Sequence, residues 1–382
     1  MTRTLRVAHV GTYHRDSADG TEKTVAGLVS WLPAHSVDVE VWQPRRGATE
    51  VAERDVDGVR IFELPAYEGT RGFWRGVPDE TQRFVAARRR HVDCVHFHSG
   101  LVPEHVAIAD QVHGPYAIAP NGAYSRANLS GRNWWFKQGW LRVRERAYID
   151  RAALLHAVSE PEAVELHDQF PRLSVSLIHN ALDVPSVPSV APLDTGGSRW
   201  LVFLGRLAVE QKGLDVLLSG YAAFLASTGD VTTRLLLVGP DYRGGQAELE
   251  RLRRALGIED RVEFRAPLFG TDKWSMLASA FALVHPSRWD GLPFTVLEAM
   301  AARRPLLVAP GTNLGPQLEA YGAGVVVEPT TDGVARGLRR LVGMSEGQLT
   351  EMGDSGRRLV EERFTWPQAA RQMADAYRAL VG

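Results

Sequence analysis

The chain has 382 residues, 23% of them charged, and a formal net charge of −1, which indicates a globular protein of two or three domains without an electrostatic reason to bind nucleic acid. Its single cysteine, Cys94, cannot form a disulfide within the chain, and the N-terminus lacks a signal-peptide pattern, so we expect a cytoplasmic protein. No apolar run is long enough to cross a bilayer.

Short β-rich runs alternate with helical stretches, which predicts parallel sheets with helices on both faces. Strands are expected at 5–10, 37–42, 59–64, 94–98, 116–120, 154–159 and 175–180, and in a second set at 200–204, 234–239, 262–266, 281–285, 306–310 and 324–328. A proline- and glycine-rich linker at 181–199 separates the two sets. We therefore predict two doubly wound, Rossmann-like α/β domains that face each other across a cleft.

A polar loop follows the first expected strand and leads into an amphipathic helix expected at 24–32. Such a loop lies at the carboxyl edge of the sheet, where ligands bind. It lacks the Gly-x-Gly-x-x-Gly fingerprint, which argues against a dinucleotide-dependent oxidoreductase.

Two histidines, His96 and His98, alternate along an expected strand and should point to the same face. A pair of this kind can bind a metal, but the sequence offers no carboxylate or third ligand at a useful spacing. We therefore expect histidines that are satisfied within the fold, and we predict no metal ligand.

A locally basic stretch at 126–146 holds six basic residues and one acid, Glu145, interleaved with aromatic residues that include Trp134 and Trp135. Three interpretations stay open: a helix packed on the core, a wall of the acceptor site, or a helix on a membrane surface. The net charge of the chain and the interruption by Glu145 disfavour the membrane surface. Membrane contact through 126–146 is therefore not favoured, and we predict no vesicle binding at physiological salt.

The segment from His285 to Pro305 joins an apolar run to a helix expected at 295–303. Seven residues separate Asp290, in the intervening loop, from Glu298, in the helix. A helix N-terminus offers free N–H groups and the positive end of its dipole to an anion, and a carboxylate accepts hydrogen bonds from sugar hydroxyls. This unit therefore has the parts to hold a sugar and a phosphate together.

The run Pro-Ser-Arg-Trp-Asp-Gly-Leu-Pro-Phe-Thr-Val-Leu-Glu-Ala-Met-Ala in this segment resembles the Glu-x7-Glu motif of the retaining glycosyltransferases of family 4, which have the GT-B fold. Asp290 stands where the first glutamate is usual, and Glu298 matches the second. Residues 203–215 resemble the family's Gly-Arg-Leu…Lys-Gly-x-Asp motif, in which Arg206 and Lys212 match the cations that clamp the donor diphosphate. The chain has only four lysines against 40 arginines, which further marks Lys212.

The resemblance implies a UDP- or GDP-linked sugar as donor substrate and no cofactor, because fixed cations can stabilise the departing diphosphate without a metal. The diphosphate is expected on Arg206, Lys212 and the helix start, Glu298 on the ribose hydroxyls, and Asp290 on a sugar hydroxyl. The remaining donor contacts are expected from Leu268, by its backbone to the base, and from Phe294 and Thr295.

In the first domain, the resemblance aligns Asp19 and Gly20 with a glycine pair near the donor phosphates, so Asp19 departs from the pattern. Asn121 stands where the family has a histidine at the reaction centre; a competing alignment uses His113, and we favour Asn121. Asparagine donates a hydrogen bond but cannot titrate.

The resemblance also implies an acceptor-side domain at 1–184, a nucleotide-sugar domain at 199–365, and a last helix at 366–382 that packs back on the first domain. We expect a retaining glycosyltransferase acting on a small soluble acceptor. Two alternatives remain: a catalytically impaired nucleotide-sugar-binding protein, motivated by Asn121 and Asp19, and an enzyme acting on a membrane lipid-linked acceptor.

Overall fold

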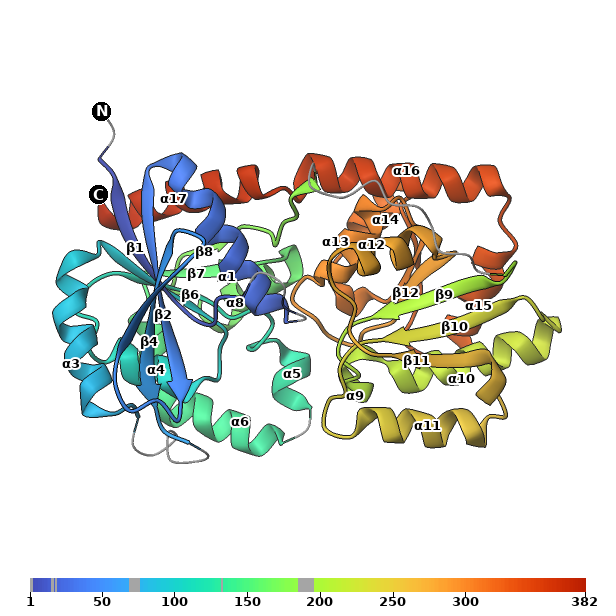
Figure 1. The fold of residues 1–382 in the computed structure, drawn as a ribbon, viewed down its shortest axis with the longest axis horizontal. Helices are drawn as coiled ribbons and strands as arrows, with labels where there is room; N and C mark the ends of the chain where they lie inside the picture. The colour runs from blue at the N-terminus through green and yellow to red at the C-terminus, as the bar shows by residue number, and fades with distance from the viewer. Residues whose placement is uncertain (1–2, 15–16, 18, 69–75, 132, 185–195) are drawn as a thin grey trace. The chain divides into compact units, whose positions relative to one another are not determined.

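The computed structural model describes residues 3–14, 17, 19–68, 76–131, 133–184 and 196–382. The chain divides into two compact units, one formed by Met1–Asn180 with Trp366–Gly382 and the other by Ala181–Thr365. Each unit is an α/β structure built on one sheet (Figure 1). Among the described residues, no helix combines the length and apolar character that a bilayer crossing requires.

The sheet of the first unit has eight strands in the order β3-β4-β2-β1-β5-β6-β7-β8. All neighbouring strands are parallel except β3 and β4. Its strands are β1 (Leu5–Val10), β2 (Val37–Arg46), β3 (Ala52–Val56), β4 (Val59–Ala66), β5 (Cys94–His98), β6 (Tyr116–Ala119), β7 (Leu154–Ala157) and β8 (Val175–Leu177).

The first seven predicted strands are all present, but the sequence missed β3. This strand reads Ala-Glu-Arg-Asp-Val and is largely exposed, so it lacks the apolar pattern by which the others were found. It pairs antiparallel with β4 at the sheet edge, and Arg54 on β3 forms an ion pair with Glu63 on β4. Opposite charges on neighbouring strands accompany the pairing of β3 with β4. The sequence of one strand alone cannot reveal such a pair.

The helices of the first unit lie between these strands, with the last one coming from the end of the chain. They are α1 (Gly20–Trp31), η1 (Leu32–His35), α3 (Asp79–Arg88), η2 (Arg89–His91), α4 (Pro103–Ala109), α5 (Arg126–Ser130), α6 (Trp134–Trp140), the π-helix η3 (Leu141–Glu145), α7 (Arg146–Asp150), α8 (Glu160–Gln169) and α17 (Trp366–Val381).

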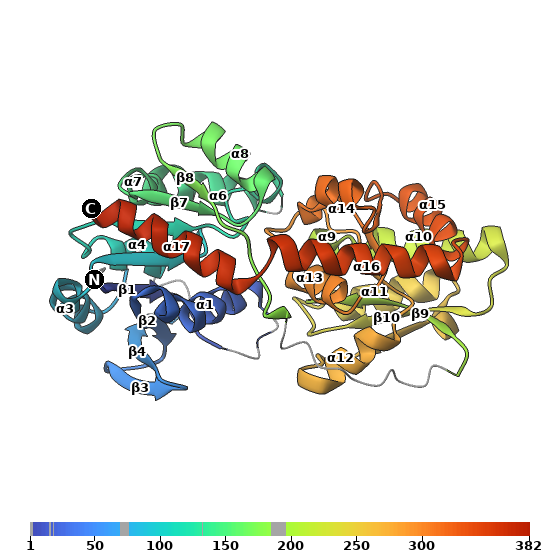
Figure 2. The same ribbon diagram turned by 90° about the horizontal axis from the view of Figure 1, so that it is seen from above.

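The last helix, α17, packs against α1, η1 and β5 in the first unit (Figure 2). Gly27 on α1 makes this contact possible, since a Cβ added there would lie 1.9 Å from the Trp366 ring. The Arg378 guanidinium donates to the backbone oxygen of His35 at 2.6 Å. A small residue on one helix thus receives a large ring from a segment more than 300 residues later in the chain.

The second unit holds a fully parallel six-stranded sheet in the order β11-β10-β9-β12-β13-β14. All six predicted strands of the second set are present. They are β9 (Arg199–Leu204), β10 (Thr233–Val238), β11 (Val262–Arg265), β12 (Ala282–His285), β13 (Leu306–Val308) and β14 (Val325–Val326).

Helices cover both faces of this sheet, with α10 and α11 on one side and α13, α14 and α16 on the other (Figure 1). The helices are α9 (Val209–Lys212), α10 (Leu214–Thr228), α11 (Gly245–Ala255), η5 (Glu259–Arg261), α12 (Gly270–Ser279), α13 (Phe294–Ala301), η6 (Pro310–Thr312), α14 (Gly315–Tyr321), α15 (Thr331–Val342) and α16 (Glu346–Arg363).

The sheet order brings together two loops that are distant in the sequence. Strands β9 and β12 are parallel neighbours, with Val202 opposite Leu283, so both end at the same edge of the sheet. The loop after β9 carries Arg206 and Lys212, and the loop after β12 carries Asp290. The topology therefore gathers the residues of both predicted motifs at one carboxyl edge.

Candidate donor-binding site

Glycine at position 213 lets the two loops touch. Gly213 has φ +63°, and a Cβ at this position would lie 2.2 Å from the backbone oxygen of Pro286. Next to it, the Arg288 backbone N–H donates to the Gln211 backbone oxygen at 2.9 Å, and the Arg288 guanidinium donates to both carboxylate oxygens of Asp215. The Lys212 segment is therefore held directly against the loop that carries Asp290.

Lys212 and Asp290 form a buried ion pair at the centre of this contact. The Lys212 Nζ donates to both carboxylate oxygens of Asp290, at 2.8 and 2.7 Å. Asp290 also accepts from Ser287 Oγ at 2.9 Å, and its Oδ2 lies 3.2 Å from His285 Nε2. Burial opposes ionisation of this carboxyl, yet Lys212 and His285 hold the pKa of Asp290 well below its ordinary value.

Glu298, the second acid of the motif, forms another ion pair one turn into α13. Its Oε1 accepts from Lys273 Nζ at 2.9 Å, and the residue is only 2% exposed. Lys273 lies on α12, where its Nζ is also 5.1 Å from the centre of the Trp274 ring. A carboxylate buried to this degree needs such a partner, because an uncompensated charge away from water is costly.

The two acids of the motif thus hold the two lysines of this unit, Lys212 and Lys273. The sequence pointed to Asp290, Glu298 and Lys212, but it missed Lys273 as a member of the site. The scarcity of lysine in this arginine-rich chain was the signal that could have found it. His285 was also missed, since its position at the end of an apolar strand gives no sign of the carboxylate beside it.

The start of α13 has the features of an anion site. The helix begins after Pro293, and no side chain caps it. Its first backbone N–H groups therefore receive no acceptor from the N-cap residue. The Thr295 Oγ1 atom is buried, with no hydrogen-bond partner among the described residues. Phe294 is buried at the first helical position and anchors this terminus. The roles expected for Phe294 and Thr295 in donor binding stay predictions.

Arg206 lies at the end of β9, where backbone segments pack closely. A Cβ on Gly239, which has φ +152°, would lie 1.9 Å from the backbone oxygen of Gly205. The Arg206 guanidinium lies over the Tyr242 ring, 5.2 Å from its centre. Leu268 is partly buried in the loop between β11 and α12, the helix that carries Lys273. All donor-side residues predicted in the second domain therefore fall in one structural unit.

The first unit explains why Asp19 departs from the family pattern. Asp19 is the N-cap of α1, and its side chain accepts from the Thr21 backbone N–H at 2.8 Å. Its φ of −89° is available to any residue, so glycine is not required there. Helix α1 begins at Gly20, and the prediction that it begins at residue 24 was wrong because this capping signal was overlooked.

Asn121 follows β6 at the carboxyl edge of the first sheet, whereas His113 precedes the strand. Asn121 has φ +53°, a left-handed conformation that asparagine tolerates better than most residues. Its Nδ2 donates to the Ala119 backbone oxygen at 3.1 Å. The neighbouring Gly122 N–H donates to Glu162 Oε1 at 2.6 Å, so a buried carboxylate fixes this turn.

The basic stretch at 126–146 is not one helix but a succession of α5, α6, η3 and α7. Trp134 and Trp135 on α6 are 57% and 67% exposed, and Val143 is 77% exposed. Glu145 is fully buried and accepts from the Tyr124 hydroxyl at 2.6 Å. Some of the aromatic residues therefore face solvent instead of the core. Because Glu145 is buried, its negative charge does not interrupt the basic residues on the surface.

The expectation that His96 and His98 lack a third ligand was also wrong. Strand β1 pairs with β5 so that His9 lies opposite His96, and one nitrogen from each of the three rings falls within 4.8 Å of the others. The pairing of two strands separated by more than 80 residues created this cluster, and spacing within one strand could not reveal it.

Comparison with known proteins agrees with this geometry. Residues 18–185 match the model of Glycosyltransferase Family 4, and residues 198–343 match the model of Glycosyl transferases group 1. The GDP-mannose:cellobiosyl-diphosphopolyprenol alpha-mannosyltransferase of Xanthomonas campestris is 23% identical over 389 residues, covering 99% of this chain and 98% of that protein. The D-inositol 3-phosphate glycosyltransferase of Streptomyces bingchenggensis is 30% identical over 182 residues, covering 46% of this chain and 39% of that protein.

Solved structures show the same fold. Sucrose-phosphate synthase from Thermosynechococcus elongatus has a TM-score of 0.76 at 19% identity, covering 98% of this chain and 99% of that one. Anabaena HepE in complex with UDP and glucose has a TM-score of 0.75 at 16% identity, covering 98% and 100%. The fold and the two matched models define a glycosyltransferase of the GT-B type. More particularly, the chain belongs among the glycosyltransferases related to family 4.

Proposed function

We propose that the protein transfers a sugar from a UDP- or GDP-linked donor to an acceptor hydroxyl with retention of anomeric configuration. The observation that carries this proposal is the pair of buried ion pairs, Lys212 with Asp290 and Lys273 with Glu298, beside the uncapped start of α13. Family membership supports retention, and the single buried thiol, Cys94, suits the reducing cytoplasm in which such donors are made.

In this proposal Arg206, Lys212 and the start of α13 receive the donor diphosphate. Negative charge develops on the diphosphate as the sugar departs, and cations already fixed in place stabilise it without reorganisation. Asp290 fixes the position of Lys212, since both of its oxygens accept from the Nζ. A sugar hydroxyl that binds Asp290 then donates to a carboxylate oxygen that also accepts from Lys212. Binding of the sugar is thereby coupled to the position of the lysine that binds the diphosphate.

Glu298 is proposed to accept the ribose hydroxyls, with Lys273 holding its charge in the ionised form. The base is proposed to lie near the backbone of Leu268, before α12. Gly20 and Asn121 are proposed to serve the donor and acceptor from the first unit. Asn121 can donate a hydrogen bond but cannot act as a base, so the departing diphosphate is left to assist deprotonation of the acceptor.

The test is a donor screen followed by product analysis. Calorimetry with UDP, GDP and their sugar conjugates should identify one nucleotide that binds, and nuclear magnetic resonance of the product should show the anomeric configuration of the donor. Activity should persist in the presence of a chelator. Inversion of configuration, or binding of a nucleotide sugar without hydrolysis or transfer to any acceptor, would favour a different mechanism or an impaired binding protein.

For the acceptor, the first candidate is a small soluble molecule such as a sugar or a natural-product intermediate. Names of relatives support this class, since they include a D-inositol 3-phosphate glycosyltransferase and an alpha-D-kanosaminyltransferase of Streptomyces kanamyceticus.

The second candidate is a lipid-linked acceptor, and a specific surface favours it. We define the aromatic–basic surface as Trp134, Trp135, Phe136, Arg142, Val143 and Arg144, all of which are exposed. Indole rings favour the interfacial region of a bilayer, and arginines attract anionic headgroups. A relative that covers nearly the whole chain is named for a diphosphopolyprenol acceptor.

Vesicle binding separates the two candidates. Flotation with vesicles that contain anionic lipid should recover the protein if the acceptor is lipid-linked, and added salt should weaken the binding. Changing Trp134 and Trp135 to Ser should abolish the recovery, whereas the same change at Trp274, on α12 of the other unit, serves as the control. Absence of binding at low salt would leave the soluble acceptor as the proposal.

A further inference from the structure

A layer of buried histidines occupies one face of the first sheet, where apolar side chains would be expected. His9 on β1 lies opposite His96 on β5, and His98 is two residues further along the same strand. On the other side of β5, strand β6 places Ala117 beside His96 and Ala119 beside His98. These small residues leave room for imidazole rings above the sheet.

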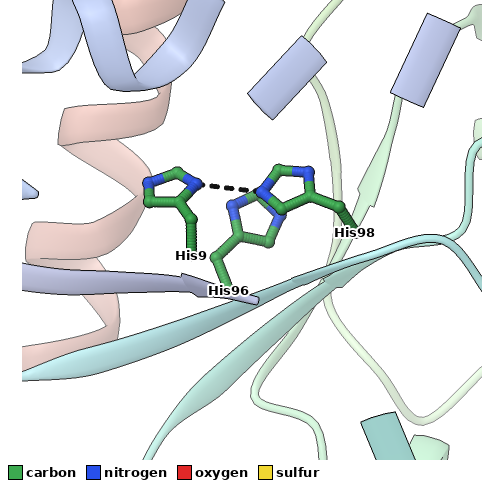
Figure 3. Close-up of side chains that lie close together, drawn as sticks. All are labelled: His9, His96 and His98. Carbon is green, nitrogen blue, oxygen red and sulfur yellow. Dashed lines mark hydrogen bonds between the residues drawn. The ribbon is translucent and has the colours of Figure 1, made fainter. Parts of the chain in front are cut away.

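The three rings converge on one point (Figure 3). His9 Nδ1 and His98 Nε2 lie 2.9 Å apart, and the His96 and His98 ring centres are 4.2 Å apart. One nitrogen from each ring lies within 4.8 Å of the others. On the side of α17, His96 Nδ1 lies 2.7 Å from the Tyr377 hydroxyl. This spacing is that of three imidazoles around a common centre.

Each ring also keeps a buried nitrogen without a hydrogen bond. These atoms are His9 Nε2, His96 Nε2 and His98 Nδ1, and among the described residues they have no partner. Burial lowers the pKa of all three histidines, so the rings are neutral at pH 7. Neutral imidazole is the form that binds a transition metal, and no proton must be displaced into solvent.

We propose that His9, His96 and His98 form a buried site for one divalent transition metal ion, with zinc as the probe. Three histidine nitrogens and one further oxygen make a common coordination set for zinc. The Tyr377 hydroxyl, already hydrogen-bonded to His96, or a water molecule is placed to complete it. The site does not depend on the proposed donor chemistry, which uses none of these residues.

Metal binding at this point needs a change of tautomer and a small separation of the His9 and His98 rings, since two nitrogens bound to one tetrahedral zinc lie farther apart than a hydrogen bond. In the hydrogen bond between His9 and His98, the nitrogen of one ring carries the proton and donates, and the nitrogen of the other ring accepts. When both nitrogens bind a metal, that proton moves to the second nitrogen of its own ring, and each imidazole stays neutral. The ion would link β1, β5 and, through Tyr377, α17, so its role is to stabilise the first unit.

The rings are buried, so the ion is expected to enter as the chain folds and to exchange slowly afterwards. The experiment therefore uses the full chain without a histidine tag, unfolded in chelator and refolded with and without one equivalent of zinc. Elemental analysis after extensive dialysis should find about one zinc per chain, and X-ray absorption should show three imidazole ligands. The zinc-loaded protein should also melt at a higher temperature.

His98→Gln should reduce the bound zinc at least tenfold, because a two-histidine site binds far more weakly. His91→Gln, which changes an exposed histidine on η2, is the matched control and should leave the zinc content unchanged. If His98→Gln fails to fold, refolding the unaltered chain with cobalt gives a second readout, because a tetrahedral site produces a visible absorption band. A refolded chain that retains no zinc and shows no such band overturns the proposal, as does zinc that persists equally in both variants.

Discussion

At the scale of single residues, Asp290 is a shorter acid in a position where the family has a glutamate. Its carboxylate lies beside Ser287 on the same loop and His285 at the end of β12, and both of its oxygens accept from Lys212. Asp290 therefore links the two loops of the candidate donor site. It also fixes the position of the Lys212 ammonium group.

Replacing Lys212 with Ala is expected to slow glycosyl transfer by about 10²-fold or more, which corresponds to losing one fixed cation from the leaving-group site. Steady-state kinetics with the natural donor would measure it. Arg340→Ala removes an exposed cation on α15 of the same unit and should leave the rate unchanged. Asp290→Asn should reduce the rate as well, and it should weaken binding of the intact donor more than binding of the bare nucleoside diphosphate. Full activity of Lys212→Ala would show that Lys212 does not stabilise the departing diphosphate.

Replacing Glu298 with Gln is expected to weaken binding of the nucleoside diphosphate by about ten- to a hundredfold, because a lost charge-assisted hydrogen bond costs roughly 1.5–3 kcal/mol. Calorimetry with the diphosphate alone measures this, since the ribose contact is independent of the sugar. Glu319→Gln, at an exposed glutamate on α14, is the control. Equal affinities for the two variants would place the ribose elsewhere.

Glu162, which holds the turn at Asn121, gives the first unit a pH dependence. Burial raises the pKa of Glu162 to about 7. The hydrogen bonds from the backbone N–H groups of Val158 and Gly122 favour the ionised form and oppose this rise, but burial has the larger effect. The unfolded chain ionises this group from about pH 4.5, so the contribution of Glu162 to the free energy of unfolding falls as the pH rises to about 7, by on the order of 3 kcal/mol. The buried histidines contribute with the opposite sign, because burial lowers the pKa of their side chains. Urea unfolding across this range, compared between the unaltered protein and Glu162→Gln, should therefore isolate the slope that Glu162 adds.

The variant Glu162→Gln cannot ionise, so its free energy of unfolding should lack the fall that Glu162 contributes over the same pH range. Glu351→Gln, at an exposed position on α16, should behave like the unaltered protein. A slope that is unchanged in Glu162→Gln would mean that the carboxylate is ionised in the folded protein at neutral pH.

The residues of the candidate donor site were predictable to the extent that their signals are local. Asp290, Glu298, Arg206 and Lys212 lie in motifs whose spacing along the chain singles them out. Lys273 was not predictable in the same way, because α12 meets α13 only through the packing of the second unit. His9 joins His96 by strand pairing, and no pattern within β1 indicates its partner.

At the scale of elements, the sequence predicted the buried parallel strands because each is a short apolar run between turn signals. It did not predict β3, which is polar, nor the division of 126–146 into four helical segments. The π-helix η3 turns Glu145 inward to Tyr124 while Val143 faces solvent. A projection that assumes a regular α-helix cannot predict the directions of these side chains, because the segment is a π-helix.

The contact between α1 and α17 gives a prediction at this scale. Gly27→Ala should destabilise the first unit by about 1–3 kcal/mol, since the added methyl group would overlap the Trp366 ring. Thermal unfolding of the full chain measures the loss. Gly347→Ala, in the first turn of α16, meets no atom within 4 Å and is the control. If both variants melt at the same temperature, α17 accommodates the methyl group by moving.

At the scale of the whole molecule, the chain leaves the first unit at Asn180, forms the second unit, and returns at Trp366. The second unit is continuous in sequence, with its own core around Phe203, Tyr221 and Val284. The first unit is discontinuous, and Tyr377 of the returning helix lies against the histidine layer. The two units therefore differ in what each needs in order to fold.

Ending the chain after Thr365 should leave the second unit folded and destabilise the first. Calorimetry of the shortened chain should show one transition that resembles the second unit in the full protein and a weakened or missing transition for the first. Adding a peptide of residues 366–382 should restore part of the lost heat. Two unaltered transitions in the shortened chain would show that α17 is dispensable.

The return of the chain at Trp366 also bears on how the protein is made. During synthesis the first 180 residues leave the ribosome well before α17 exists, so their histidine layer and the groove around Gly27 stay uncovered while the whole second unit is translated. Proteins generally fold as units in the order of synthesis. Here the unit that is synthesised first is completed last, because it cannot acquire α17 until the whole second unit has been translated.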